Sequence, residues 1–353
     1  MSGPYEVSDQ EPRRIRELGI TVGRYPTGPR NALTDVPGVR VGHSTIRDGD
    51  ALHTGVTAVV PDAVDRFGGQ LPAGLCVGNG FGKLIGATQL VELGALETPI
   101  LLTGTLSAFR VADALVSYVL SLPGNEAVTT LNPVVGETND GYLSDIRRRP
   151  VTQEHVLAAL HTAAVDDVHE GCVGAGTGTC ALGFKGGIGT SSRVVGLGEP
   201  GECTVGVLVQ TNFGGTLQVR GVPIPSDVSA SPDASEPQGN SCMIVVAVDR
   251  GLDSRQLRRV ATRAVFGMAR AGSDFAQGSG DYAIAFSTVT ASENVPDQDL
   301  DPVFFAAQEA VEEAVLNSLT MAVTTTGHER HTRYAVSHEE IVRRCHDAGV
   351  ITR

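Results

Sequence analysis

The chain lacks an excess of positive charge, a long apolar run and an apolar N-terminal segment. Lys and Arg number 27 against 40 Asp and Glu, which gives a net charge of −13. This charge disfavours binding to a phosphate backbone or to an anionic membrane surface, so we expect neither nucleic acid nor a membrane as partner. No apolar run approaches the roughly 20 residues of a membrane span. The first residues also show no secretory signal.

Closely spaced cysteines are absent as well. The sequence has six cysteines and none forms a C-x-x-C pair, which makes a zinc ribbon improbable and favours reduced, buried thiols. We therefore expect a cytoplasmic protein. The histidines do not form H-E-x-x-H, because the residue four positions after His338 is Val342, and they are interpreted as exposed or helix-capping. We expect no metal and no cofactor.

Short apolar runs alternate with helical patterns along the chain. The runs predict strands at 39–43, 56–60, 205–211, 242–248 and 283–286. Helices are predicted at 81–94, 107–120 and 152–164, from Asp253 or Ser254 to Gly272, from Asp301, and from Ser337 to Gly349. Stacked sheets covered by helices on both outer faces would bury such continuous apolar strands.

A glycine-rich segment, residues 171–189, resembles a phosphate-binding loop at first sight. Its spacing differs from G-x-G-x-x-G, because Ala181 stands where the last glycine belongs. Gly82 and Lys83 do not complete a Walker A motif either, because the required first glycine is replaced by Val77. A structural turn or a pocket wall is favoured, and a nucleotide or sugar-phosphate site remains the alternative.

Ser241 lies where two kinds of sequence meet. Residues 221–240 are polar and rich in proline, whereas residues 242–248 are uniformly apolar. If the bond between Asn240 and Ser241 breaks, the serine gains a free α-amine and becomes nucleophile and base in one residue. Taken alone, the junction fits an ordinary linker better.

Other polar residues follow or precede predicted strands. Ser279 and Asp281 stand at the start of a strand, as in a simple turn, yet Asp281 is able to support a positive charge on a nearby amine. Asn212 follows another strand and is either a turn residue or an amide donor to an oxyanion.

The loop at residues 137–142 offers a possible cation site. By default it is a solvated loop. Alternatively, Glu137 and Asn139 bind a cationic group and Tyr142 contributes a hydroxyl.

Several ordered motifs together resemble one known family. They are NALTDVPGVRVGH (31–43), GETNDGYLSD (136–145), VGAGTG (173–178), GFKGGIGTSS (183–192) and GNS (239–241). The chain resembles the L-aminopeptidase/D-esterase-amidases and β-peptidyl aminopeptidases from about Ile15 to the C-terminal helix.

This resemblance implies an α+β fold, a four-layer αββα sandwich like that of the N-terminal-nucleophile hydrolases but with its own connectivity. It implies one catalytic domain over residues 1–353, cut into fragments 1–240 and 241–353 that stay together within a homotetramer.

The resemblance also implies roles for the catalytic residues. Ser241 matches the nucleophile, and Ser279 and Asp281 match the residues that assist it. Asp281 is one methylene shorter than the glutamate of some relatives. Asn212 matches the oxyanion donor.

The substrate-binding residues follow in the same way. Glu137 and Asn139 match the loop that receives the free amino group of the substrate, and Tyr142 lies beside the site. The implied activity is release of L-, D- or β-amino acids from the N-termini of short peptides, amides or esters. An acyltransferase of similar self-cleaving fold and a nylon-oligomer type hydrolase are the alternatives within this fold.

Overall fold

The computed structural model describes residues 10–64, 68–198, 201–226, 241–290 and 295–351. Two β-sheets are its main elements. The first has the strand order β1 (Val39–Asp48), β2 (Leu52–Pro61), β6 (Ile100–Gly104), β7 (Val134–Thr138), β4 (Leu84–Ile85). The second has the order β10 (Ile188–Gly196), β11 (Glu202–Asn212), β14 (Ser241–Val248), β15 (Gly280–Ser287), β3 (Leu71–Gly80), β5 (Ala95–Leu96).

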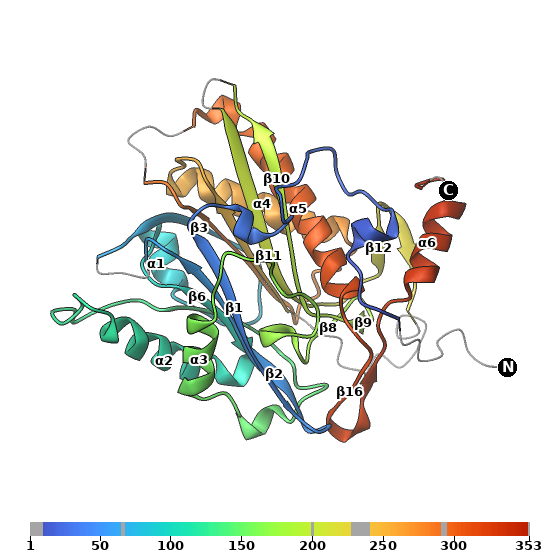
Figure 1. The fold of residues 1–353 in the computed structure, drawn as a ribbon, viewed down its shortest axis with the longest axis horizontal. Coiled ribbons are helices and arrows are strands. Elements are labelled where there is room, and N and C mark those ends of the chain that lie inside the picture. The colour runs from blue at the N-terminus through green and yellow to red at the C-terminus, as the bar shows by residue number, and fades with distance from the viewer. Residues whose placement is uncertain (1–9, 65–67, 199–200, 227–240, 291–294, 352–353) are drawn as a thin grey trace.

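Helices cover the outer face of each sheet. The larger ones are α2 (Ala108–Ser121) and α3 (Gln153–His161) on the first sheet, and α4 (Ser254–Arg270) and α5 (Asp301–Thr320) on the second. Figure 1 shows these two helix pairs in different parts of the molecule with strands between them. Two shorter helices are α1 (Ala87–Glu92) and α6 (His338–Asp347).

Three apolar clusters separate the resulting four layers. The middle cluster joins the sheets, for example Leu102 of the first sheet with Met243 and Ile284 of the second. One outer cluster joins α2 and α3 to the first sheet, and the other joins α4 and α5 to the second. The predicted αββα sandwich is therefore confirmed.

The strands at the centre of the second sheet are buried on both faces. Every residue of β14 and β15 is buried. β14 pairs antiparallel with β11 and parallel with β15. The uninterrupted apolar pattern of residues 242–248 has this cause, because neither face of the strand meets water.

Most expected helices form, and their ends follow the capping residues. Asp253 caps α4, accepting a hydrogen bond from the Gln256 N–H at 2.7 Å, and Ser337 caps α6. The helix expected at 81–94 was wrong in its first half. It begins only at Ala87, because Gly86 has a φ of +87° and the preceding residues 84–85 pair with β7 instead.

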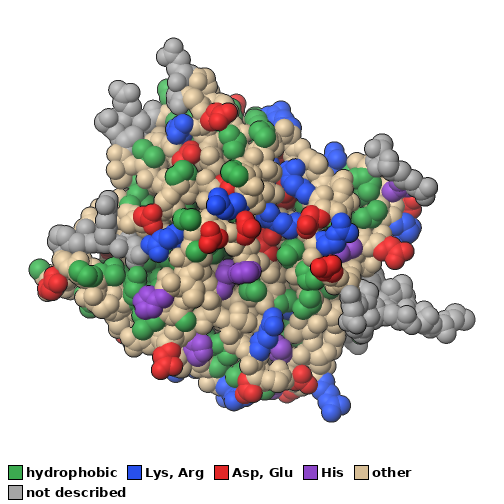
Figure 2. All heavy atoms as spheres, in the orientation of Figure 1, with side chains coloured by type: hydrophobic (Ala, Val, Ile, Leu, Met, Phe, Trp, Pro, Cys, Tyr) green, Lys and Arg blue, Asp and Glu red, His purple; other side chains and the backbone are tan. Residues whose placement is uncertain are grey.

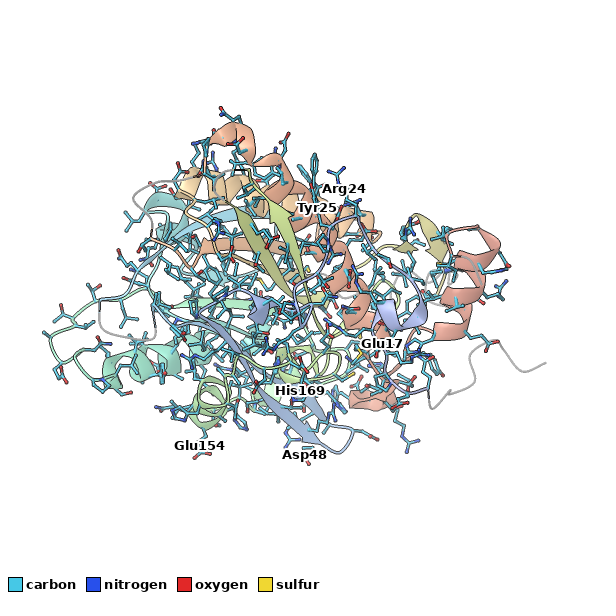
Figure 3. All side chains as sticks on the ribbon, turned by 45° about the horizontal axis from the view of Figure 1, so that its top comes forward. Glu17, Arg24, Tyr25, Asp48, Glu154 and His169 are labelled. Atoms are coloured by element: carbon cyan, nitrogen blue, oxygen red, sulfur yellow. The ribbon has the colours of Figure 1, made fainter. Side chains whose placement is uncertain are left out.

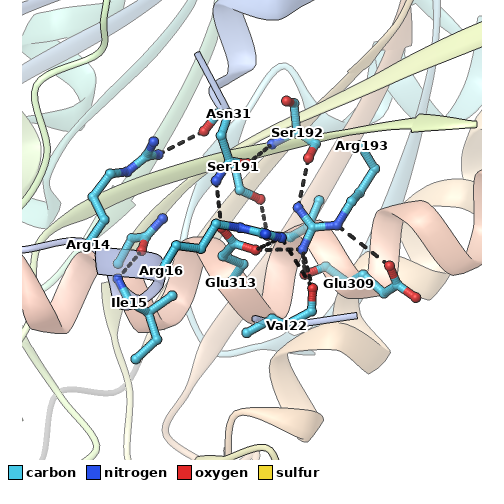
Figure 4. A network of polar contacts seen from close by, with 12 residues as sticks. Arg14, Ile15, Arg16, Val22, Asn31, Ser191, Ser192, Arg193, Glu309 and Glu313 are labelled. Carbon is cyan, nitrogen blue, oxygen red and sulfur yellow. Dashed lines mark hydrogen bonds and ion pairs between the residues drawn. The ribbon is translucent and has the colours of Figure 1, made fainter. Parts of the chain in front are cut away.

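A buried ionic network ties the N-terminal segment to the second sheet (Figure 4). Arg193 of β10 is fully buried, and its Nη2 lies 2.6 Å from Glu313 Oε2 on α5. Its Nε lies 3.5 Å from Glu309 Oε2. Arg16 donates to the other oxygen of Glu313 at 2.7 Å, and the amide of Asn31 donates to it as well.

The same N-terminal segment, at Arg24, also contacts the exposed side of α5 at Phe305. The Arg24 guanidinium lies 5.0 Å from the ring centroids of both Tyr25 and Phe305. Figure 3 labels Arg24 and Tyr25. On the face drawn in Figure 2, acidic and basic side chains are interspersed. No helix in the described residues combines the length and the apolar character needed to cross a bilayer.

Candidate active site

Three strand ends meet at Ser241. It is the first residue of β14 and is paired with Asn212, the last residue of β11, and with Gly280, the first residue of β15. Ser241 is buried, with 4% of its surface exposed, and it lines a cavity of about 740 Å³. Ser241, where the polar and apolar segments of the sequence meet, is thus the first residue of a central strand, and it lines a cavity.

Asp281 lies on the neighbouring strand β15, beside the start of β14, and Ser279 directly precedes that strand. The Ser279 hydroxyl donates to Asp281 Oδ1 at 2.8 Å, and Asp281 is paired in the sheet with Cys242. Burial raises the pKa of Asp281 to about 6, although hydrogen bonds from the Ser279 hydroxyl and the Cys242 N–H favour the ionised form. The other oxygen of Asp281, Oδ2, is buried and has no hydrogen-bond partner among the described residues.

Asn212 is held in one orientation by two hydrogen bonds. Its Oδ1 accepts from the Cys180 N–H at 2.9 Å, and its Nδ2 donates to the Asn139 carbonyl at 2.9 Å. A carboxamide nitrogen carries two hydrogens, so within the described residues one remains for an oxygen in the cavity. This fits an oxyanion donor that is oriented before substrate arrives.

Glu137 places a buried carboxylate on the cavity wall. Its Oε1 accepts from the Lys83 backbone N–H at 2.9 Å and lies 3.4 Å from Lys83 Nζ. Its Oε2 is buried and has no hydrogen-bond partner in the part of the chain described. A buried carboxylate oxygen without a partner is costly, and a cationic ligand would satisfy it.

Asn139 and Tyr142 also line the cavity. The Asn139 side chain accepts from the Gly141 N–H at 2.9 Å and so shapes its own loop, while its carbonyl holds Asn212. The Tyr142 ring is stacked on His331, with centroids 4.4 Å apart, and the Arg333 guanidinium lies 4.2 Å from the centroid of the tyrosine ring. Both of these groups fix the position of the phenol.

Several cavity residues were missed from the sequence. Lys83, Thr105, Cys180 and His331 line the same cavity as Ser241. The sequence places Lys83 only in an incomplete phosphate-binding motif, and it predicts an exposed or helix-capping role for His331. No local pattern marks either one, because only the fold brings their segments together.

The glycine-rich segment is packed against other backbone. A Cβ on Gly176 would overlap the backbone of Gly187 and Ile188, and one on Gly178 would overlap the carbonyl of His53. These close approaches require glycine, so the structural interpretation is favoured over a nucleotide loop.

Asn240 lies outside the described residues. Cleavage of the bond between Asn240 and Ser241 therefore stays a prediction.

Comparison with known proteins places this geometry in a family. Residues 31–333 match the family described as Peptidase family S58. The β-peptidyl aminopeptidase BapA of Sphingosinicella xenopeptidilytica is 39% identical to the chain over 365 residues, which covers 94% of this chain and 90% of that protein.

Two solved structures share the fold over nearly the whole chain. A protein from Pyrococcus horikoshii superposes with a TM-score of 0.88 at 42% identity, covering 96% of this chain and 99% of that one. The L-aminopeptidase D-Ala-esterase/amidase of Ochrobactrum anthropi gives a TM-score of 0.88 at 34% identity, with 96% and 99% coverage. That enzyme is described as a prototype for the serine aminopeptidases and as a variant of the Ntn hydrolase fold.

Proposed function

The chain belongs to peptidase family S58 and is a serine aminopeptidase with a variant of the Ntn hydrolase fold; on this premise we propose that Ser241 is its nucleophile. The enzyme activates itself by cleaving the bond before Ser241. It then releases N-terminal residues from short peptides, amides or esters through an acyl-enzyme.

One observation carries this proposal above the others. Ser241 and Glu137 line the same cavity, and one carboxylate oxygen of Glu137 has no hydrogen-bond partner among the described residues. A nucleophile and an anionic group in one cavity favour substrates whose free ammonium lies close to the scissile carbonyl. A blocked N-terminus leaves the carboxylate unpaired, which explains exopeptidase selectivity.

Self-processing begins with an N→O acyl shift. The Ser241 hydroxyl attacks the carbonyl carbon of Asn240, the peptide C–N bond breaks, and the Asn240 acyl group passes to the serine oxygen as an ester. Water then hydrolyses the ester. The products are a carboxylate on Asn240 and a serine with a free α-amine.

In the mature enzyme the α-amine acts as the base. Its ordinary pKa of about 7.7–8.0 leaves a substantial neutral fraction near pH 7.5. It takes the hydroxyl proton as Ser241 attacks the substrate carbonyl, and the amide of Asn212 stabilises the oxyanion. The α-ammonium then protonates the leaving amine, and water releases the acyl group.

The Ser279–Asp281 pair stabilises the α-ammonium that forms during this cycle. Asp281 lies beside the backbone of Cys242, directly after the nucleophile. A carboxylate near the amine favours its positive charge and so raises its basicity.

The substrate preference of the relatives extends to this chain as a proposal. One relative is named for β-peptidyl substrates and another for L-aminopeptidase and D-Ala-esterase/amidase activity. We expect a panel of p-nitroanilides carrying β-alanyl, L-alanyl and D-alanyl groups to rank these three classes. Addition of amino acid acceptors to the same assay would reveal acyl transfer in place of hydrolysis.

Intact mass measurement tests self-processing directly. We expect the purified protein to show two fragments, the smaller beginning with Ser241. Ser241→Ala should stay uncut and inactive, because methyl cannot attack the carbonyl. A Ser241→Ala protein that still splits at this bond contradicts the proposal.

Location and assembly complete the proposal. The six cysteines have free thiols, which supports a cytoplasmic location. We propose a homotetramer of processed chains, and light scattering coupled to size-exclusion chromatography would measure its mass.

A further inference from the structure

Lys83 brings a positive charge to the cavity. Among the described residues that line it, Lys83 is the one lysine or arginine. Its Nζ donates to Thr105 Oγ1 at 2.6 Å and lies 3.4 Å from Glu137 Oε1. The side chain is partly exposed, at 37%. A cation therefore stands beside the carboxylate that receives the substrate's amine.

The contact between Lys83 and Glu137 leaves both groups with capacity for a ligand. The distance of 3.4 Å exceeds the roughly 2.7–2.9 Å of a charge-assisted hydrogen bond. The backbone N–H of Lys83 already binds the same oxygen more closely, and Glu137 Oε2 has no partner in the described residues. An ammonium has three hydrogens, and the contacts with Thr105 and Glu137 account for two.

A carboxylate acceptor and an ammonium donor thus stand side by side near the nucleophile. We propose that Lys83 and Glu137 together recognise a zwitterionic acyl group. The substrate ammonium binds the Glu137 carboxylate, and a carboxylate on the same substrate carbon binds Lys83 Nζ. The four charges then alternate in sign around a ring, so that each has two opposite neighbours.

This arrangement defines a substrate class. The inference rests on the proposed function, in which a free amine binds Glu137 and the acyl group is transferred to Ser241. A β-aspartyl group has an amine and a carboxylate on one carbon, and a methylene separates that carbon from the scissile carbonyl. It is a β-amino acyl group with one added charge. We therefore assign β-aspartyl peptides and amides as favoured substrates.

Substrates in which a neutral or cationic group replaces this carboxylate test the contact with Lys83. A carboxamide in place of the carboxylate has nearly the same shape but no charge to match Lys83. An ammonium at that position would be repelled. Because Lys83 is partly exposed, water and salt weaken the attraction, and we expect about a 10-fold preference for carboxylate over carboxamide.

Three p-nitroanilides with one β-amino acyl backbone provide the test. The amine-bearing carbon carries hydrogen (β-alanyl), a carboxylate (β-L-aspartyl) or a carboxamide (the α-amide of β-L-aspartyl). For wild-type enzyme, kcat/KM should be about 10-fold higher for the carboxylate than for the carboxamide, and the ratio should fall as salt is raised. In Lys83→Gln the ratio should fall to about one, since the neutral side chain attracts neither. Glu137→Gln should instead lower kcat/KM for all three substrates together.

Equal wild-type rates for the carboxylate and the carboxamide would overturn the inference. So would a preference that survives in Lys83→Gln, because the charge of Lys83 would then not be its source. If no substrate is hydrolysed, the proposed function fails, and binding decides the inference separately. Calorimetric titration should show L-aspartate binding about 10-fold more tightly than its α-amide to wild type but not to Lys83→Gln. Equal binding to wild type refutes the recognition pair.

Discussion

Asp281 is the residue whose ionisation matters most to the proposed chemistry. Burial raises its pKa to about 6, so the carboxylate gains its charge just below neutral pH. Its hydrogen bond from Ser279 directs one oxygen, and its neighbour in the sheet is Cys242, the residue after Ser241. The enzyme therefore needs pH values above about 6 for this negative charge to be present.

We predict that Asp281→Asn lowers kcat/KM roughly 100-fold at pH 8, because the α-ammonium loses its counter-charge. In wild type, the pH profile of kcat/KM should rise through two ionisations, Asp281 near 6 and the α-amine higher. The variant should keep only the upper one. A variant profile that retains the inflection near pH 6 contradicts this assignment.

Asp281→Asn should lower activity but increase thermal stability relative to wild type as the pH rises. A carboxyl whose pKa is higher in the folded state binds more protons there, so ionisation between about pH 4 and 6 destabilises the fold. The thermal midpoint of Asp281→Asn minus that of wild type should therefore increase from pH 4.5 to 7. A difference that stays constant would show that the raised pKa is not a property of Asp281.

The sequence predicted part of this site. Ser241, Asn212 and Glu137 stand in motifs whose order is recognisable, and the fold brings all three to one cavity. Lys83 and His331 have no such signal, because their segments meet the site only through tertiary packing. Contacts between distant segments depend on the whole fold, so local pattern does not reveal them.

Glycines set the spacing between strands and the helices that cross them. Cβ atoms on Gly42, Gly74 and Gly189 would overlap the backbones of α3, α4 and α5 respectively. On β1, β3 and β10, therefore, a glycine stands where a helix backbone comes close. None of the three has a positive φ, so close approach and not turn geometry requires the glycine.

We predict that Gly189→Ala destabilises the protein by about 1–3 kcal/mol or more, because the added methyl has no room beside Ala314 and Ser318 of α5. Gly196→Ala on the same strand is the matched control, since no atom lies within 4 Å of its Cβ position. The control should change stability by no more than about 0.5 kcal/mol in thermal or urea unfolding. Equal losses in the two variants would contradict the packing argument.

Element identity was more predictable than element boundaries. Residues 242–248 and 301–320 show clear apolar patterns because the strand is buried throughout and most of the helix is buried. The helix predicted at 81–94 does not form before Ala87. The left-handed backbone of Gly86 separates the short strand β4 from the helix. The order of strands in each sheet has no local signal, because β3 joins β15 across about 200 residues of sequence.

At the scale of the whole molecule, the two predicted fragments are interlocked. The fragment 241–353 supplies β14 and β15 to the middle of the second sheet, between β11 and β3 of the other fragment. The ionic network also joins the two fragments, since Arg16 and Arg193 belong to one fragment and Glu313 to the other. Cleavage before Ser241 would therefore leave both fragments in one folded unit.

Glu313→Gln should weaken that unit by about 3–5 kcal/mol at pH 7, because it leaves the buried Arg193 without its closest anion. Burial alone would raise the pKa of Glu313, yet the Arg16 hydrogen bond and the charges of Arg193 and Arg16 hold it below its ordinary value. The charge of Glu313 therefore stabilises the fold at pH values above the pKa that this glutamate has in the unfolded chain. This stabilisation is lost as the pH falls through the lower pKa that it has in the folded protein.

Thermal midpoints of Glu313→Gln and wild type should accordingly converge as the pH drops below about 4. Glu340→Gln on α6 serves as control, because its partner Arg343 is exposed and such pairs contribute little. A pH-independent difference between Glu313→Gln and wild type would show that shape rather than charge is responsible.

The position of β14 also sets when activity can arise during synthesis. Ser241 meets Asn212 as soon as β14 pairs with β11, but Ser279 and Asp281 arrive only with β15, which ends at Ser287. A chain that ends before Ser279 lacks both of these residues, whichever way β14 and β11 have paired. We therefore expect the proposed activity to arise only after β15 has joined the sheet.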